Sequence, residues 1–348
     1  MILPSHEKRY VMMDIGARDG ILPQWKPMAN LARVVGFDPD EEECKRLNAA
    51  NTGVEFLPFA LHSSSGEMTF YLTELEYCHG FAPCDEKYFG RFPNAINNMV
   101  RDEITLYADS LDNIVSKASY DHVDFIKIDT EGTELAILQG ARNTLKTHRV
   151  LGLLVEVWWD PRLKNQPAFS DLDSFIRGEG FSFFDIECQR YPRNALPVGR
   201  MNKGRGRWFR FFPRFTPDAG ALCCEIPYRY FGQILTGDAL YFRDPVWDLS
   251  QGETGFHWDD ETILRLVGLL DLYNYPDFAI EVLDFYRDRF KRSVDVDGLI
   301  DRLVPPVDGV VLSFDEYWDR SAKLFLDHHL APHIRPKARL VKPRYRFK

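Results

Sequence analysis

The chain has 348 residues, of which 45% are hydrophobic, and its formal net charge is -9. This length exceeds what one hydrophobic core usually organises, and no apolar run reaches the roughly 18 residues of a membrane span or has the form of a signal peptide. We therefore expect a cytoplasmic protein, and we expect its six cysteines to be reduced because they form no CxxC pair.

The negative charge is distributed unevenly along the sequence. Val246 to Leu330 holds 18 acidic and eight basic residues, a net of -10. The segments Arg200 to Arg214 and Pro332 to Lys348 contain six and seven Lys or Arg residues, respectively, and no acid. We interpret the basic tail as a solvated arm, and the overall acidity argues against a nucleic-acid partner.

The first half of the chain alternates short β-rich runs with helical patterns, which is typical of an α/β fold with a largely parallel sheet. The predicted strands are Tyr10 to Ile15, Arg33 to Phe37, Val54 to Pro58, Val123 to Asp129, Val150 to Val157 and Phe181 to Ile186. The helices predicted between them include Glu41 to Ala50 and Glu134 to Gln139.

Two further strands depart from this alternation. Glu67 to Tyr71 follows a Ser-rich turn and is typical of an edge strand. Ala239 to Arg243 has no helix before it, and a strand reached without a crossover helix is normally antiparallel. The sequence therefore predicts a mixed sheet whose last strand is antiparallel.

After Pro245 the pattern becomes helical. Helices are predicted at Glu261 to Tyr273, Asp277 to Phe290 and Asp315 to His328, and the break at Asn274 to Pro276 indicates an αα-hairpin. We expect an α/β domain at 1–245, with a long insert at about 187–237, and a helical domain with a basic tail at 246–348. The helical domain could contact a protein partner.

Acidic and glycine residues follow the first two strands. Asp14, Gly16 and Gly20 lie in DIGARDG, and Asp38 ends the second strand in GFDPD. Ligands of open α/β sheets bind at the carboxyl ends of strands, glycines allow close approach of the backbone, and a carboxylate can accept both hydroxyls of a ribose. A nucleoside with a cationic end suits both acids.

Other interpretations of these residues remain open. The glycines could simply turn the chain, and the acids could cap helices. A nicotinamide dinucleotide is disfavoured, because Asp14 would repel its phosphates and GxGxxG is absent.

Four motifs in this order resemble the FkbM-type methyltransferases, which belong to the class I S-adenosylmethionine-dependent superfamily. They are DIGARDG, GFDPD, SLD at Ser110 to Asp112 and IKIDTEGTE at Ile126 to Glu134, and LLVEVWW follows where the family has its next strand. The resemblance covers about Tyr10 to Arg243 and implies a Rossmann-like sheet with S-adenosyl-L-methionine as cofactor. Arg18 stands where the family usually has Asn.

By this resemblance, six positions are candidates for binding the cofactor. They are Asp14, Gly16, Ala17, Gly20, Asp38 and Ala60. Ala60, within LPFALHS, could frame the adenine by apolar contact or could belong to the core.

The stretch FIKIDTEGTE supplies the candidate catalytic residues Asp129, Glu131 and Glu134. Methylation of a hydroxyl needs its proton removed, so a carboxylate at this strand end could act as the base. Glu131 and Glu134 could instead occupy a helix N-terminus. A divalent ion is a further alternative, which we do not adopt because no histidine joins these acids. Lys127 is expected to point away from Ile126 and Ile128.

The substrate-binding candidates are Glu156, which could equally be a structural acid, and the insert residues Arg205, Arg207 and Trp208. The insert mixes guanidinium groups with aromatic rings, a composition suited to phosphate, nucleotide or sugar contacts. It could also pair with the acidic helical domain.

These observations favour a methyltransferase that acts on a hydroxyl of a carbohydrate or secondary metabolite, including phosphorylated ones. The alternatives are an RNA methyltransferase and a non-catalytic cofactor-binding or scaffold module. The first would show salt-dependent RNA binding, and the second would bind cofactor without methyl transfer.

Overall fold

We describe a computed structural model of the chain. It describes residues 9–328 except 29, 51, 93–94, 161–162, 165, 192, 196–232, 251, 253–254 and 308. Contacts between residues divide the chain into two compact units, one running from Glu7 to Asp244 with 254–256, and the other comprising 1–6, 245–253 and 257–348.

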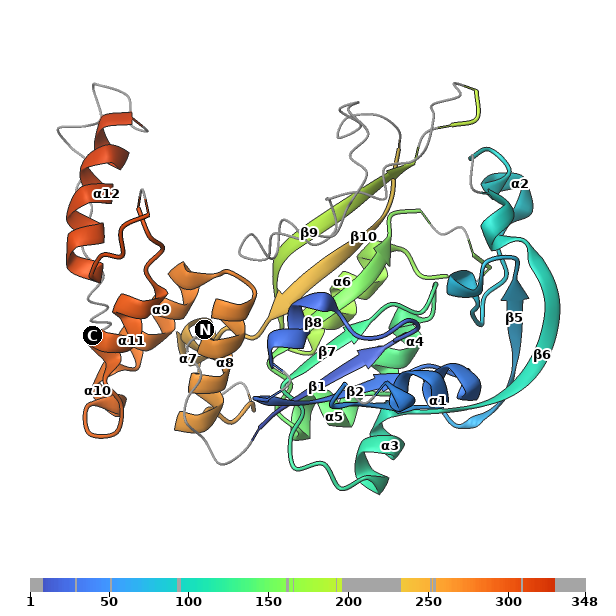
Figure 1. Ribbon diagram of the computed structural model, residues 1–348, viewed down its shortest axis with the longest axis horizontal. Helices are drawn as coiled ribbons and strands as arrows, with labels where there is room; N and C mark the ends of the chain where they lie inside the picture. The colour runs from blue at the N-terminus through green and yellow to red at the C-terminus, as the bar shows by residue number, and fades with distance from the viewer. Residues whose placement is uncertain are drawn as a thin grey trace. The chain divides into compact units, whose positions relative to one another are not determined.

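The first unit is built on a seven-stranded sheet with the order β3-β2-β1-β7-β8-β10-β9 (Figure 1). Its strands are β1 (Tyr10–Ile15), β2 (Ala32–Phe37), β3 (Val54–Leu57), β7 (Phe125–Ile128), β8 (Gly152–Trp158), β9 (Ser182–Tyr191) and β10 (Gln233–Phe242). β3, β2, β1, β7 and β8 pair in parallel, whereas β10 is antiparallel to both β8 and β9. The predicted mixed sheet with an antiparallel last strand is therefore confirmed.

The central strands are mostly apolar, and both of their faces are covered. Every residue of β1, β7 and β8 is buried. One face packs against four helices, α3 (Leu111–Lys117), α4 (Glu134–Gln139), α5 (Arg142–Thr147) and α6 (Phe169–Gly178), whose apolar side chains form one core cluster with the sheet. α1 (Glu41–Ala49) packs beside β3 through a smaller cluster around Cys44 and Phe56.

The first unit also contains a second sheet of three strands. Its order is β4 (Ala60–Leu61), β6 (Val100–Asp109) and β5 (Gly66–Thr73). The predicted edge strand at Glu67 to Tyr71 is thus an edge strand of this second sheet, where it pairs antiparallel with β6. Between β5 and β6 the chain forms η2 (Glu76–Cys78), α2 (Glu86–Phe89) and η3 (Ala95–Asn98), and η1 (Pro23–Met28) follows β1.

The hairpin β9–β10 extends further than the sequence pattern predicted. Both strands run into the expected insert, to Tyr191 on one side and from Gln233 on the other. Most of the remaining insert, 196–232, lies outside the described residues, and this segment includes the substrate candidates Arg205, Arg207 and Trp208.

The second unit is helical. Its helices are α7 (Pro245–Ser250), α8 (Asp260–Leu272), α9 (Pro276–Phe285), α10 (Arg287–Phe290), α11 (Val296–Leu303) and α12 (Phe314–His328). α8 and α9 form the αα-hairpin, with Asn274 in the left-handed region at φ 64° and Pro276 as the first residue of α9. Among the described residues, no helix is both long enough and apolar enough to cross a bilayer.

The turn after β1 depends on one glycine. Gly16 has φ +82°, and a Cβ at this position would lie 1.9 Å from the carbonyl oxygen of Asp129. The Gly16 and Ala17 N–H groups each donate to Phe37 O at 3.0 Å, which fixes the turn between β2 and β7. A side chain cannot be accommodated here without moving a strand end.

Substituting Gly16→Ala should therefore lower the free energy of unfolding by about 2–4 kcal/mol, from a disfavoured φ and an overpacked contact. Chemical denaturation measures this loss. Gly178→Ala is the matched control, because a Cβ there meets no atom within 4 Å and alanine is the better helix former. Equal stability of the two variants would contradict the packing of this turn against β7.

Candidate functional site

A cavity of about 430 Å³ lies at the carboxyl ends of β1, β2 and β7. Its wall comes from the turn after β1, the end of β2, the segment Phe59 to Leu61, the η2 region and the end of β7. This is the edge of a parallel sheet where ligands bind, and the volume is typical of small-molecule sites.

A buried ion pair joins the first and fourth motifs at the base of this cavity. The Lys127 Nζ lies 2.9 Å from Asp14 Oδ1 and donates to Gly16 O at 2.9 Å. Asp14 is only 1% exposed, so burial raises its pKa, and Lys127 opposes this shift. Lys127 points away from Ile126 and Ile128 because neighbouring strand residues face opposite sides of the sheet.

The two acids of GFDPD, Asp38 and Asp40, have different positions and contacts. Asp40 caps α1, its Oδ1 accepting from the N–H groups of Glu42 and Glu43. Asp38 lines the cavity and is 5% exposed. Its Oδ1 accepts from Asp40 N at 2.8 Å, and within the described part of the chain no hydrogen bond or ion pair reaches Oδ2. Burial raises the pKa of Asp38.

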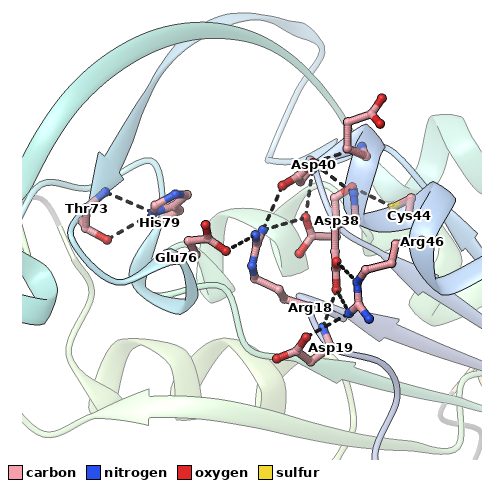
Figure 2. A network of polar contacts seen from close by, with 11 residues as sticks. Arg18, Asp19, Asp38, Asp40, Cys44, Arg46, Thr73, Glu76 and His79 are labelled. Carbon is pink, nitrogen blue, oxygen red and sulfur yellow. Dashed lines mark hydrogen bonds and ion pairs between the residues drawn. The ribbon is translucent and has the colours of Figure 1, made fainter.

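Arg18, in the turn after β1, connects the end of β2 to η2 across the cavity. Figure 2 shows its guanidinium between Asp38 and Asp40 on one side and Glu76 on the other. The distances are 3.9 Å to Asp38 Oδ1, 3.2 Å to Asp40 Oδ2 and 2.6 Å to Glu76 Oε2. Where the resembling family has Asn, this chain thus places a cation beside Asp38.

Three further carboxylates gather at the end of β7. One oxygen each from Asp129, Glu131 and Glu156 lies within 4.8 Å of the others. Asp129 and Glu131 line the cavity, and Glu156 accepts from Trp158 Nε1 at 3.4 Å. Burial, followed by these charges, raises the pKa of the nearby Cys78 thiol, which keeps it protonated.

A strained turn presents Glu131 to the cavity. Glu131 has φ 58° and is followed by Gly132 at φ 105°. Non-glycine residues are uncommon in this region, and such strain persists where the surrounding structure fixes it.

Glu134 fixes that turn. Its Oε1 accepts from Thr130 N, Gly132 N and Thr130 Oγ1 at 3.0, 3.0 and 3.2 Å. Glu134 is not among the residues that line the cavity, and burial raises its pKa. Glu134 is the first residue of α4, and this position agrees with the alternative interpretation that it occupies a helix N-terminus.

The remaining candidates fall in different places. Gly20 and Ala60 line the cavity, and a Cβ at Gly20 would meet no atom within 4 Å. The Ala17 side chain instead packs into the core cluster with Cys44, Leu47 and Phe56.

Several residues of the cavity wall are not among the candidates predicted from the sequence. Of these, Lys127 was the easiest to identify from the sequence, because its alternation with Ile126 and Ile128 places its side chain on the opposite face of the sheet. Glu76, His79 and the rings of Phe70, Tyr77 and Phe81 come from a segment without a motif.

The cavity fits a nucleoside with a short polar chain. Asp38 Oδ2 offers an acceptor at a nearly buried carboxylate, which suits a ribose hydroxyl. Phe59 and Tyr77, which are 41% and 54% exposed, add aromatic surface to the wall, suited to a flat base. The open space over Gly20 leaves its backbone accessible to the rest of the ligand.

Comparison with known proteins gives a family for residues 14–183. Residues 14–183 match the methyltransferase FkbM domain. No protein of curated function matches the sequence.

The chain also matches solved structures, including two methyltransferases. A TehB-like SAM-dependent methyltransferase from Corynebacterium glutamicum is 9% identical, with 68% of this chain and 82% of that chain covered at a TM-score of 0.30. The 1,6-didemethyltoxoflavin-N1-methyltransferase of Burkholderia thailandensis, solved with S-adenosylhomocysteine, is 13% identical, with 68% and 72% covered at 0.29. Likeness at this level carries no argument about substrate.

The family match spans all four motifs quoted from the sequence and the strands that surround the cavity. Residues 14–183 therefore form a methyltransferase domain of the FkbM family, and its cofactor is S-adenosylmethionine.

Proposed function

We propose that the protein methylates a hydroxyl oxygen of a carbohydrate or secondary metabolite. The observation that carries this proposal is Asp129 at the end of β7, whose side chain lines the cavity and is 22% exposed. A partly exposed carboxylate can contact an acceptor hydroxyl and receive its proton.

The bound cofactor supplies an electrophilic methyl group on a sulfonium. With the cofactor bound, the Asp129 carboxylate would accept the proton that the acceptor hydroxyl loses. Holding the two reacting atoms in line contributes much of the rate in such a transfer. Asp38 would hold the ribose, and the backbone at Gly16 and Gly20 would lie against the methionine chain.

Lys127 contacts both the loop after β1 and the proposed base Asp129. Its Nζ holds Asp14 and Gly16 O of the first loop and lies 3.8 Å from Asp129 Oδ2. A single cation therefore neutralises part of the negative charge at the end of β7. Asp14, which has Lys127 as partner, is assigned to shaping the loop rather than to binding the cofactor's ammonium directly.

Replacing Asp129→Asn should lower kcat by about 10²–10⁴-fold, because the amide cannot accept the proton. S-adenosylhomocysteine affinity should stay within about 3-fold, since the side chain keeps its size. The assay measures S-adenosylhomocysteine released with a panel of sugar and phenolic acceptors, and mass spectrometry and NMR locate the new methyl.

Asp102→Asn, an exposed acid on β6, is the matched control for this substitution. Full kcat in the Asp129 variant would show that another group accepts the proton. A methyl on nitrogen, or turnover only with RNA, would contradict methylation of a small hydroxyl compound.

Replacing Asp38→Asn should weaken S-adenosylhomocysteine binding by about 10-fold, because one oxygen that accepts a ribose hydroxyl becomes a donor. Asp40→Asn is the control, since asparagine caps a helix as well as aspartate does. Calorimetric titration compares the three proteins, with NAD as a second ligand. Equal losses in both variants would mean that the end of β2 acts through structure and not through contact.

A further inference from the structure

The ring of His79 belongs to the cavity wall, although no motif includes it. It lies one residue after η2 and shares the cavity with Asp38 and Phe70. Figure 2 shows it anchored by Thr73, beyond Glu76 when viewed from Arg18. The Phe70 ring packs edge-on against it, with centroids 6.3 Å apart.

The hydrogen bonds of His79 determine its tautomer. Thr73 N lies 3.1 Å from Nδ1, and a backbone N–H can only donate. The Thr73 hydroxyl, 3.2 Å from Nδ1, donates to Leu75 O at 2.8 Å. Nδ1 is therefore the acceptor, and the single proton of the neutral ring resides on Nε2.

The surroundings keep this ring neutral. Burial lowers the pKa of His79, and the positive charges of Arg18 and Arg101 lower it further, against the opposing charges of Glu76 and Asp40. Protonation at Nδ1 would also direct one N–H against another and cost the bond to Thr73. His79 is thus a fixed donor, and among the described residues no hydrogen bond reaches its Nε2.

We propose that His79 recognises the purine of the cofactor, donating from Nε2 to an unprotonated ring nitrogen. This inference rests on the proposed function, because it assumes that the nucleoside occupies the cavity. Adenine carries ring nitrogens with lone pairs at its edge, and the aromatic side chains near His79 suit its flat faces.

In this tautomer His79 cannot act as the base that removes the proton of the acceptor hydroxyl. His79 is the only histidine among the described residues that line the cavity. With Nε2 protonated and Nδ1 bonded to Thr73, it has no lone pair to offer an acceptor hydroxyl. Among the described residues that line the cavity, carboxylates such as Asp129 and Glu131 can accept the proton of the acceptor hydroxyl.

The first test reads the tautomer directly by long-range ¹H–¹⁵N correlation NMR on the protein without ligand, with His79→Asn used for assignment. We expect the pattern of a neutral ring protonated at Nε2 at pH 8, which charges only below the pH at which an exposed histidine does. A proton on Nδ1, or a ring that charges above pH 6.5, would overturn the inference without bearing on the methyltransferase assignment.

The second test measures recognition with S-adenosylhomocysteine and its 1-deaza, 3-deaza and 7-deaza analogues. One analogue should bind the wild-type protein about 10-fold more weakly than S-adenosylhomocysteine. His79→Asn keeps an acceptor for Thr73 N–H but lacks the Nε2 donor, so the analogue and the parent should bind it within about 2-fold. His79→Gln, whose amide reaches the Nε2 position, should restore part of the discrimination.

Two outcomes overturn the inference in distinguishable ways. If S-adenosylhomocysteine binds tightly but no analogue shows coupling to His79, the purine does not receive this hydrogen bond, and the proposed function stands. If S-adenosylhomocysteine does not bind the wild-type protein, the proposed function and this inference fail together.

Discussion

The buried pair of Lys127 and Asp14 is the interaction on which the rest of the site depends. Both groups are almost fully removed from water, at 8% and 1% side-chain exposure, so the charge of each group stabilises the charge of the other. Their pairing is possible because β1 and β7 are neighbours in register, with Asp14 opposite Lys127. The bond from Lys127 to Gly16 O then carries this order into the turn that bounds the cavity.

The cavity beside this pair has two ends that differ in their chemistry. The β7 end concentrates carboxylates, with Asp129 and Glu131 close to Glu156, and suits proton transfer. The β2 end is a network in which Arg18 spans Asp38 and Glu76, and His79 and the aromatic rings continue this wall. The proposed roles follow this division, with the nucleoside at the β2 end and the acceptor hydroxyl at the β7 end.

The side chains of several candidate residues point in directions that a sequence pattern specifies incompletely. Glu134 lies in the same motif as Asp129, yet it turns under the loop to accept three hydrogen bonds. Asp40 and Asp38 are two positions apart, yet one caps α1 and the other faces the cavity. Ala17 directly follows Gly16, but its methyl enters the core. In each case the local backbone geometry at a strand end selects the direction, and spacing alone does not.

The sequence by itself determined the alternation of strands and helices, the antiparallel last strand and the four motifs, because each depends on local periodicity or on residues close together in the chain. It could not determine that Lys127 pairs with Asp14, that Arg18 reaches Glu76, or that Thr73 fixes the tautomer of His79. The first two join motifs or segments far apart in the chain. The last depends on the turn that brings the chain after β5 back on itself. The strand β6 pairs with β5 and was not predicted, because most of its residues are exposed and its sequence lacks a run of alternating apolar residues. Only tertiary structure brings these groups within hydrogen-bonding distance, since side-chain contacts between distant segments leave no periodic signal in the sequence.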